Sequence, residues 1–214
     1  MAAKSLSPAS RSSAPGSSRA SRSSSSNVLR TVASSPRAAA GNFRLAIDRS
    51  FDGVGAGLGV TGTVFSGEIT AGDEARVLGA DMEVRVRGIH AQDRQADVGQ
   101  AVERCALIIT GTGVDKETVH RGDWVLAESA HVPTKRADAL IRILNWEPRS
   151  FRHWTPVHLH LAAAAVTGRV AILEGGSIPP GGTGLVQLVL DEPIGALTGD
   201  RFILRDQSAQ RTIG

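Results

Sequence analysis

The stretch FRLAIDRSFDGVGAGLGVTGTVFSGEITAGDEARVLG, residues 43–79, decides the fold of this chain. It contains GLGVTG at 57–62, which has the G-x-G-x-x-G spacing of a dinucleotide-binding turn, and Asp81 follows at about the expected 20 residues. Such a turn binds pyrophosphate only where a helix begins directly after it, because the helix N-terminus holds the phosphate. Here the β-branched, alternating segment TVFSGEITAG follows instead. We therefore expect a glycine-rich turn between two strands, with Val60 to Gly62 entering the second.

Apolar residues from Phe43 onward recur at every second position, which is typical of half-buried strands. In FRLAI they are Phe43, Leu45 and Ile47, and in MEVRVRGI the apolar Met82, Val84 and Val86 alternate with charged residues. Gly, Asp and Pro separate the segments at turn positions. The pattern continues through ALIRIL, VHLHL, GRVAIL, LVQLVL and RFILR. With no long helical period, the sequence predicts an all-β fold whose short strands suit closed barrels.

A polar, proline-bearing stretch, HVPTKRAD at 131–138, interrupts the strands at their midpoint. We expect two consecutive β-barrels, residues 43–131 and 136–214, joined by a short linker. The chain contains no G-x-x-x-x-G-K-[ST] motif and no alternation of strands with helices. A nucleotide-hydrolysing core is therefore not predicted.

The N-terminal tail, residues 1–42, differs in composition from the rest. It holds fourteen Ser and six basic side chains but no Asp or Glu. Such a segment buries too little apolar surface to offset its ordering entropy, so we predict disorder, either as a flexible extension or as a misassigned start. A transit peptide has a similar composition but needs an amphipathic period, which is missing. Without the tail, 18 Lys and Arg face 21 Asp and Glu, so the pI of 9.7 is poor evidence for nucleic-acid binding by the barrels.

Targeting signals and cysteine content favour the cytoplasm. There is no apolar run of roughly 18 residues and no secretory leader, so neither a membrane span nor secretion is expected. The single Cys105 cannot form an internal disulfide, which suits a reducing compartment, and it is expected to be a small core residue.

Several other residues could bind a metal or RNA, but an ordinary surface or core role explains them more simply. His158 and His160 share a strand face near His153, but no Cys, Asp or Glu stands at a spacing suited to zinc, so no metal site is expected. Arg85 and Arg87 lie on a polar strand face, where they either contact RNA phosphate or form an ordinary surface. The tryptophans are expected to pack inside the barrels rather than to stack on bases; they are Trp124, Trp146 and Trp154.

Motifs in a fixed order run through residues 43–214. In the first half they are an Asp48–Arg49 pair, VTG at 60–62, GEI and GD, and then HRGDWVLA; in the second half they are VTGRV, IPPGGTGLVQLVLDEPI and RFILR with RTIG. In this order they resemble domains II and III of the translational GTPases related to elongation factor Tu. Four segments resemble the selenocysteine-specific branch more closely: FRLAIDRSF, RVRGIHAQD, RGDWVLAE and TPVHLHLAAAAVTGRV.

This resemblance implies a function. The barrels would help to bind selenocysteyl-tRNA for GTP-dependent delivery to the ribosome at recoded UGA codons. In the family, GTP and Mg belong to a domain that precedes Phe43, and winged-helix domains that read an RNA hairpin follow the second barrel. The expectation is thus a fragment with no catalytic residue, no cofactor and no GTPase activity of its own, its second barrel truncated at the C-terminus, whose partners are selenocysteyl-tRNA, the ribosome and the parent GTPase domain.

The resemblance also implies a binding pocket for the selenocysteyl end of the tRNA, formed by Asp48, Arg49 and Arg104. Guanidinium groups would favour a selenolate over the neutral hydroxyl of serine, and Asp48 would suit the ammonium group. The family runs A-G-Q-R directly into its strand, whereas three additional residues, Ala101 to Glu103, precede Arg104 here. The alternative is that Asp48 and Arg49 only satisfy each other.

Two rival functions remain at this point. The chain could be a non-catalytic β-barrel scaffold or interaction module, which has no need of the three charged residues. It could also carry domains II and III of another elongation factor Tu-like GTPase. An enzyme that binds a nucleotide through the glycine loop is excluded by the missing helix.

Overall fold

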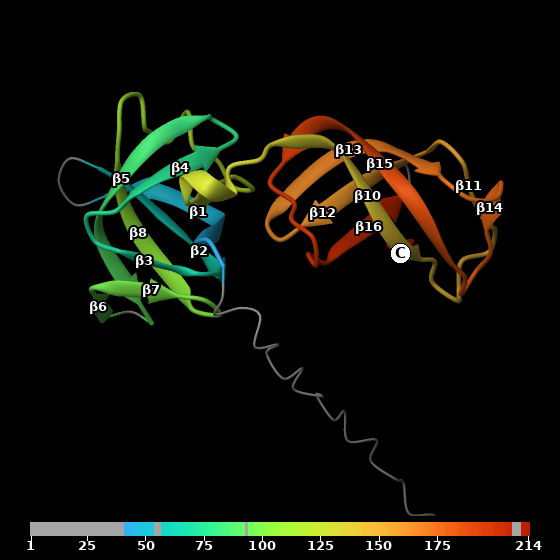
Figure 1. The fold of residues 1–214 in the computed structure, drawn as a ribbon, viewed down its shortest axis with the longest axis horizontal. Coiled ribbons are helices and arrows are strands. Elements are labelled where there is room, and N and C mark those ends of the chain that lie inside the picture. The colour runs from blue at the N-terminus through green and yellow to red at the C-terminus, as the bar shows by residue number, and fades with distance from the viewer. Residues whose placement is uncertain (1–40, 54–56, 93, 207–210) are drawn as a thin grey trace, which may run out of the picture. The chain divides into compact units, whose positions relative to one another are not determined.

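The computed structural model describes residues 41–53, 57–92, 94–206 and 211–214, which belong to one structural unit. The tail predicted to be disordered, residues 1–42, lies outside these residues except for its last two. The described chain is built of strands and one short 3₁₀ turn, η2 (Glu128–Ala130), which confirms the predicted all-β fold (Figure 1). No helix among the described residues is long and apolar enough to cross a membrane.

The first half of the described chain forms a closed barrel of six strands. The strands follow one another in space as β4 (Glu74–Leu78), β9 (Trp124–Leu126), β1 (Arg44–Asp52), β2 (Leu58–Ser66), β8 (Arg104–Thr110) and β5 (Met82–Ala91), and pairing of β4 with β5 closes the ring. Three short strands border it: β3 (Glu68–Thr70), β6 (Arg94–Ala96) and β7 (Val98–Gln100). The alternating apolar residues point inward, so Leu45, Ile47, Val60 and Leu107 are fully buried.

The second half forms a curled half-barrel of five antiparallel strands. Their order is β10 (Thr134–Arg142), β15 (Thr183–Ile194), β13 (Ala164–Ile172), β12 (Thr155–Leu161) and β16 (Phe202–Asp206), and β11 (Phe151–Arg152) pairs with β14 (Ser177–Ile178) beside them. Val157, Leu159 and Leu204 lie in its core. The prediction of two consecutive β-barrels is therefore confirmed, with the second one open at its edge strands.

The GLGVTG segment lies almost entirely inside β2, which begins at Leu58, one residue after the first glycine. Two of its three glycines, Gly59 and Gly62, are required by close approach to β1. A Cβ on Gly59 would lie 2.3 Å from the Phe51 ring, and one on Gly62 would lie 2.0 Å from the Ala46 carbonyl oxygen. A strand and not a helix follows the first glycine, as predicted, so the motif offers no helix N-terminus to a phosphate.

Arg44 joins the two barrels. Its side chain is only 4% exposed and donates from Nη1 and Nη2 to the two carboxylate oxygens of Asp200, at 3.0 and 2.7 Å, and from Nη2 to the Gly195 carbonyl at 2.8 Å. The guanidinium carbon lies 4.6 Å from the centroid of the Trp124 ring, against which Phe65 packs edge-on at 5.1 Å. The core of the second barrel continues into the first through Trp124 and its buried neighbours, which are Ala46, Leu78, Leu126 and Ala130.

The tryptophans and the cysteine test the predicted packing. Trp124 is 1% exposed, as expected, but Trp146 and Trp154 are 74% and 46% exposed, so the prediction is wrong for these two. Both stand in turns that lead into strands, where an apolar residue need not face the core. Cys105 is buried in the first core, as predicted; burial, together with the nearby Glu103 charge, raises the pKa of its thiol.

Replacing Arg44 by Met is expected to lower the free energy of unfolding by about 3 kcal/mol, because it leaves the Asp200 carboxylate without its buried partner. Adding Asp200→Asn should recover part of the loss. Urea denaturation followed by circular dichroism measures both variants. Arg94→Met is the matched control, since Arg94 is exposed and forms no ion pair within the described residues. A loss of less than about 0.5 kcal/mol for Arg44→Met would contradict the assignment.

Candidate functional site

A β-bulge in β1 positions the first candidate residue. Ile47 lies opposite Gly62 and Arg49 opposite Thr61, so Asp48 is an additional residue without a partner on β2. Bulges of this kind reorient a side chain relative to the regular alternation. The turn at 120–123 is hydrogen-bonded to β1 directly before the bulge. The Gly122 N–H donates to the Ile47 carbonyl at 2.9 Å, and the Ile47 N–H donates to the Asp123 carbonyl at 2.9 Å.

Asp48 and Arg104 form a two-pronged ion pair. Nη2 of Arg104 donates to Oδ1 of Asp48 at 2.9 Å, and Nη1 donates to Oδ2. The Thr61 hydroxyl donates to Oδ1 as well, at 3.0 Å. The Asp48 side chain is 24% exposed and that of Arg104 is 61% exposed, so the pair lies at the surface with its carboxylate held from two strands.

The three additional residues before Arg104 are accommodated in a local turn. They form a turn between β7 and β8. In this turn the Ala101 N–H donates to the Gly67 carbonyl, and the Val102 N–H donates to the Val64 carbonyl. The Glu103 carboxylate accepts from the Gln100 N–H at 3.0 Å. This turn requires a φ of 76° at Val102, and it returns the chain to β8 with Arg104 opposite Thr63.

Arg49 is exposed and, within the described residues, its side chain forms no hydrogen bond or ion pair. The alternative in which Asp48 and Arg49 satisfy each other is therefore not what the structure contains, since Asp48 is paired with Arg104. Arg49 stands next to this pair in the chain with its guanidinium available for another group.

Arg121 is a charged neighbour that the sequence reasoning missed. It lies in the turn held against Ile47, it is exposed, and its side chain has no hydrogen bond or ion pair to another described residue. Its charge acts on the Asp48 carboxylate. The signal that could have found it is the pairing of β9 with β1, which brings RGDW beside the strand that ends in Asp48 and Arg49.

The charges around Asp48 set its protonation state. Partial burial works to raise the pKa of Asp48, but hydrogen bonds from Arg104 and Thr61 and the charges of Arg104 and Arg121 outweigh it, and the net pKa is lowered. Asp48 in turn raises the pKa of Arg104. The Asp48 carboxylate is thus under the influence of two guanidiniums, those of Arg104 and Arg121, and Arg49 follows it directly in the chain. Such a cluster can attract an anion, while the carboxylate can accept from an ammonium group.

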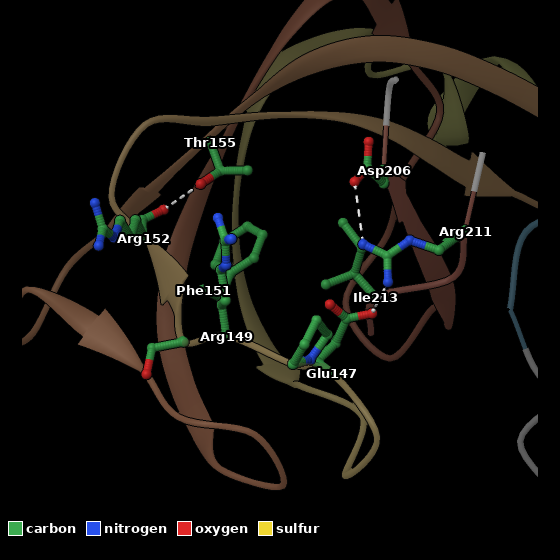
Figure 2. A pocket seen from close by; sticks show the side chains of 10 residues that line it. Glu147, Arg149, Phe151, Arg152, Thr155, Asp206, Arg211 and Ile213 are labelled. Atoms are coloured by element: carbon green, nitrogen blue, oxygen red, sulfur yellow. Dashed lines mark hydrogen bonds and ion pairs between the residues drawn. The ribbon is translucent and has the colours of Figure 1, made fainter. Parts of the chain in front are cut away.

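A second group of charges surrounds a cavity of about 540 Å³ in the second barrel. Figure 2 shows the Arg211 guanidinium between the carboxylates of Asp206 and Glu147, with nitrogen–oxygen distances of 3.4 Å to each. On the other side of Phe151, the Arg152 guanidinium points away from this cluster (Figure 2). Arg149 also lines the cavity.

The remaining candidates have ordinary surface partners. Arg85 pairs with Glu74 at 2.7 Å, and Nε of Arg87 donates to the Thr110 hydroxyl at 3.2 Å. The rings of His158 and His160 stack at 6.4 Å, and burial, with the charges of Arg205 and His158, lowers the pKa of His160. Among the described residues there is no group of three or more His, Cys, Asp or Glu placed to hold a metal ion.

Comparison with known proteins follows the division into two barrels. Residues 57–126 match the family elongation factor Tu domain 2, and residues 138–214 match the beta-barrel domain of the selenocysteine-specific elongation factor. The chain is 41% identical over 172 residues to the selenocysteine-specific elongation factor of Escherichia coli K12 and 35% identical over 171 residues to that of Haemophilus influenzae. These matches cover 80% of this chain but 26% and 27% of the relatives, so the chain spans about a quarter of their length.

Two further similarities are more distant. The chain is 30% identical over 178 residues to elongation factor Tu 2 of Streptomyces avermitilis, covering 80% of this chain and 44% of that protein. The crystal structure of translation elongation factor SelB from Methanococcus maripaludis in its apo form superposes with a TM-score of 0.69 at 23% identity, covering 83% of this chain and 42% of that one. At this identity the superposition supports the fold alone.

The ion pair of Asp48 makes stability depend on acid pH. Because the folded-state pKa of Asp48 is lowered, the stabilisation is present above the pKa of the unfolded chain, near 3.8, and is lost as the pH falls through the folded value. Asp48→Asn should therefore cost on the order of 0.5 kcal/mol at neutral pH, a small value since Arg104 is mostly exposed, and this difference should shrink towards pH 3. Urea unfolding at several pH values measures it, and a difference that stays constant down to pH 3 would count against the pair.

The turn at Val102 carries strain that a glycine would relieve. A β-branched residue at positive φ is unfavourable, whereas glycine adopts this conformation freely. Val102 is 60% exposed, so its removal loses little burial. Val102→Gly is expected to raise the free energy of unfolding by about 0.5 to 1 kcal/mol. Val102→Ala, which keeps a Cβ, is the control and should gain less; an equal or larger gain with alanine would show that positive φ is not the source.

Proposed function

We propose that the two barrels bind the aminoacyl end of selenocysteyl-tRNA through Asp48, Arg49 and Arg104, because the chain is similar over 171–172 residues to selenocysteine-specific elongation factors and its second barrel matches the beta-barrel domain of that family. The observation that carries the proposal is the arrangement at the bulge of β1. There one carboxylate is clamped by Arg104, and a second guanidinium, that of Arg49, has no partner among the described residues.

Charge is the basis of the proposed selectivity. A selenol is more acidic than a thiol, so at neutral pH selenocysteine carries a selenolate, which guanidinium groups accept. Serine presents a neutral hydroxyl of similar reach, which leaves the same guanidiniums without an anionic partner, and a site built for a charged group rejects such an analogue. Arg49 is the foremost candidate for the selenolate because its guanidinium is exposed and has no partner among the described residues. The Asp48 carboxylate would accept from the ammonium group while it remains bonded to Arg104 and Thr61.

The proposal extends to the function of the complete factor. We propose that these barrels take part in GTP-dependent delivery of the aminoacyl-tRNA to the ribosome at recoded UGA codons. The chain spans about a quarter of its relatives, and its own glycine motif lies in a strand that offers no phosphate site. In this proposal, GTP and Mg are therefore handled by a GTPase domain and not by these barrels.

The rival functions make different demands on the same residues. A scaffold gains nothing from Arg49 and Arg121, which stabilise no described contact, and a factor for other aminoacyl-tRNAs has no reason to prefer an anionic side chain. The similarity to elongation factor Tu 2 supports the second rival, in which the barrels serve another elongation factor Tu-like GTPase. Selectivity between two amino acids on one tRNA body therefore separates all three functions.

The test is a titration of this chain against one tRNA charged with selenocysteine or with serine, at neutral pH. The selenocysteyl form should bind more tightly, and Arg49→Ala should weaken it roughly tenfold or more while changing the seryl form less than about threefold. Arg94→Ala, an exposed arginine away from the bulge, is the control and should change neither. Equal affinity for the two forms, or no effect of Arg49→Ala, would reject the selective pocket.

A further inference from the structure

Three leucines form a row on the outer face of the second barrel. Leu140 of β10 stands opposite Leu185 of β15, and the N–H of Leu173, which follows β13, donates to the Leu185 carbonyl at 3.0 Å. These three strands are neighbours in the sheet (Figure 1). Residues opposite each other in an antiparallel pair lie on the same face, so the three side chains adjoin. Leu140, Leu185 and Leu173 are 65%, 45% and 51% exposed.

The burial pattern shows that this face is turned away from the core. Ala137, Ala139 and Ile141 of β10 pack in the core of the second barrel, so the residues between them point outward. Val186 and Ile172, which stand beside the other two leucines in the chain, are buried as well. Single exposed apolar side chains are ordinary on a protein surface, whereas a contiguous row of them is typical of a contact surface.

Opposite charges flank the row on strand β10. Asp138 and Arg142 stand two residues before and two residues after Leu140, so the three side chains project from the same face. The Asp138 carboxylate accepts at Oδ1 from Nε2 of Gln187 at 3.0 Å, and its other oxygen has no partner among the described residues. The Arg142 guanidinium is exposed and forms no hydrogen bond or ion pair within the described part of the chain. Both groups can therefore pair with charges of another molecule.

This pattern of charges is complementary to itself. Consider two copies that face each other, related by a two-fold axis that runs along the row of leucines. The axis brings each leucine onto its equivalent and reverses the direction of β10. Arg142 of one copy then faces Asp138 of the other, and the same pair forms a second time by symmetry. Such an isologous arrangement is the commonest way in which identical chains associate.

We propose that a second copy of this chain docks on this face, with the leucine rows in contact and an Arg142–Asp138 ion pair on either side of them. A stable interface buries roughly 800 Å² on each partner, which is more than three leucine side chains provide, so the dimer is a weak one that forms at high protein concentration. The inference does not rest on the proposed function, since it uses neither Asp48 nor a tRNA.

Sedimentation equilibrium of the full chain over a range of concentrations measures the association. Leu185→Ser should raise the dissociation constant of the dimer about tenfold or more, because it places a polar group at the centre of the row. Ile203→Ser is the matched control and should leave the constant unchanged, because Ile203 is a 50% exposed aliphatic residue on β16, outside the row. Circular dichroism confirms that each variant is folded.

Charge reversal gives a sharper test. Asp138→Arg alone and Arg142→Asp alone each bring like charges together at both flanks of the row, so each variant should be monomeric by itself. A mixture of the two variants restores opposite charges at both flanks and should associate at least as well as the unchanged chain. A loss of folding cannot produce this recovery. Arg94→Asp in the first barrel is the charge control and should not change the association.

Three outcomes would overturn the inference: a chain that stays monomeric up to roughly 1 mM, a dissociation constant that Leu185→Ser leaves unchanged, or a mixture of the two reversed variants that fails to associate. Loss of selenocysteyl selectivity with self-association retained would reject the proposed function alone. A monomeric chain that keeps this selectivity would reject only the docking of a second copy.

Discussion

The buried guanidinium of Arg44 is the interaction on which the arrangement of the two barrels depends. A cation that is 4% exposed persists only if its donors are satisfied, and here Asp200, the Gly195 carbonyl and the Trp124 ring satisfy most of them. All three partners lie at the junction, where the core of the second barrel continues into the first. Leu78, Trp124 and Leu126 of the first barrel belong to the same buried cluster as the core of the second barrel.

Strand β1 connects this junction to the candidate site. Arg44 lies near its start, Leu45 and Ile47 fill the first core, and the bulge at Asp48 then interrupts the alternation. A bulge at that position is compatible with only one kind of neighbour, because Gly62 on β2 must lack a side chain where the Ala46 carbonyl approaches it. The glycines that resemble a cofactor motif are thus part of the geometry that presents Asp48 to Arg104.

The sequence was sufficient to predict the fold because a period of two is local and is repeated in every strand. It also named Asp48 and Arg104 as site candidates through a family resemblance, and the structure brings these two side chains together. Their contact depends on the pairing of β2 with β8 and on a turn that absorbs Ala101 to Glu103 by hydrogen bonds to Gly67 and Val64. Such long-range partners cannot be read from spacing. The exposure of Trp146 and Trp154 was missed for a related reason, since apolar character does not reveal which way a turn residue points.

In both groups of arginines, one guanidinium is paired with carboxylates of the protein and the others are not. Arg104 and Arg211 are each held by carboxylates and shape their surroundings, whereas Arg49, Arg149 and Arg152 have no partner among the described residues. The paired guanidinium has a fixed position. A guanidinium without a partner needs no ion pair to be broken before it binds an anion. Guanidiniums without a described partner therefore occur at both places, although the chain without its tail carries more acidic than basic side chains. Local pairing, and not net charge, decides which arginines remain available.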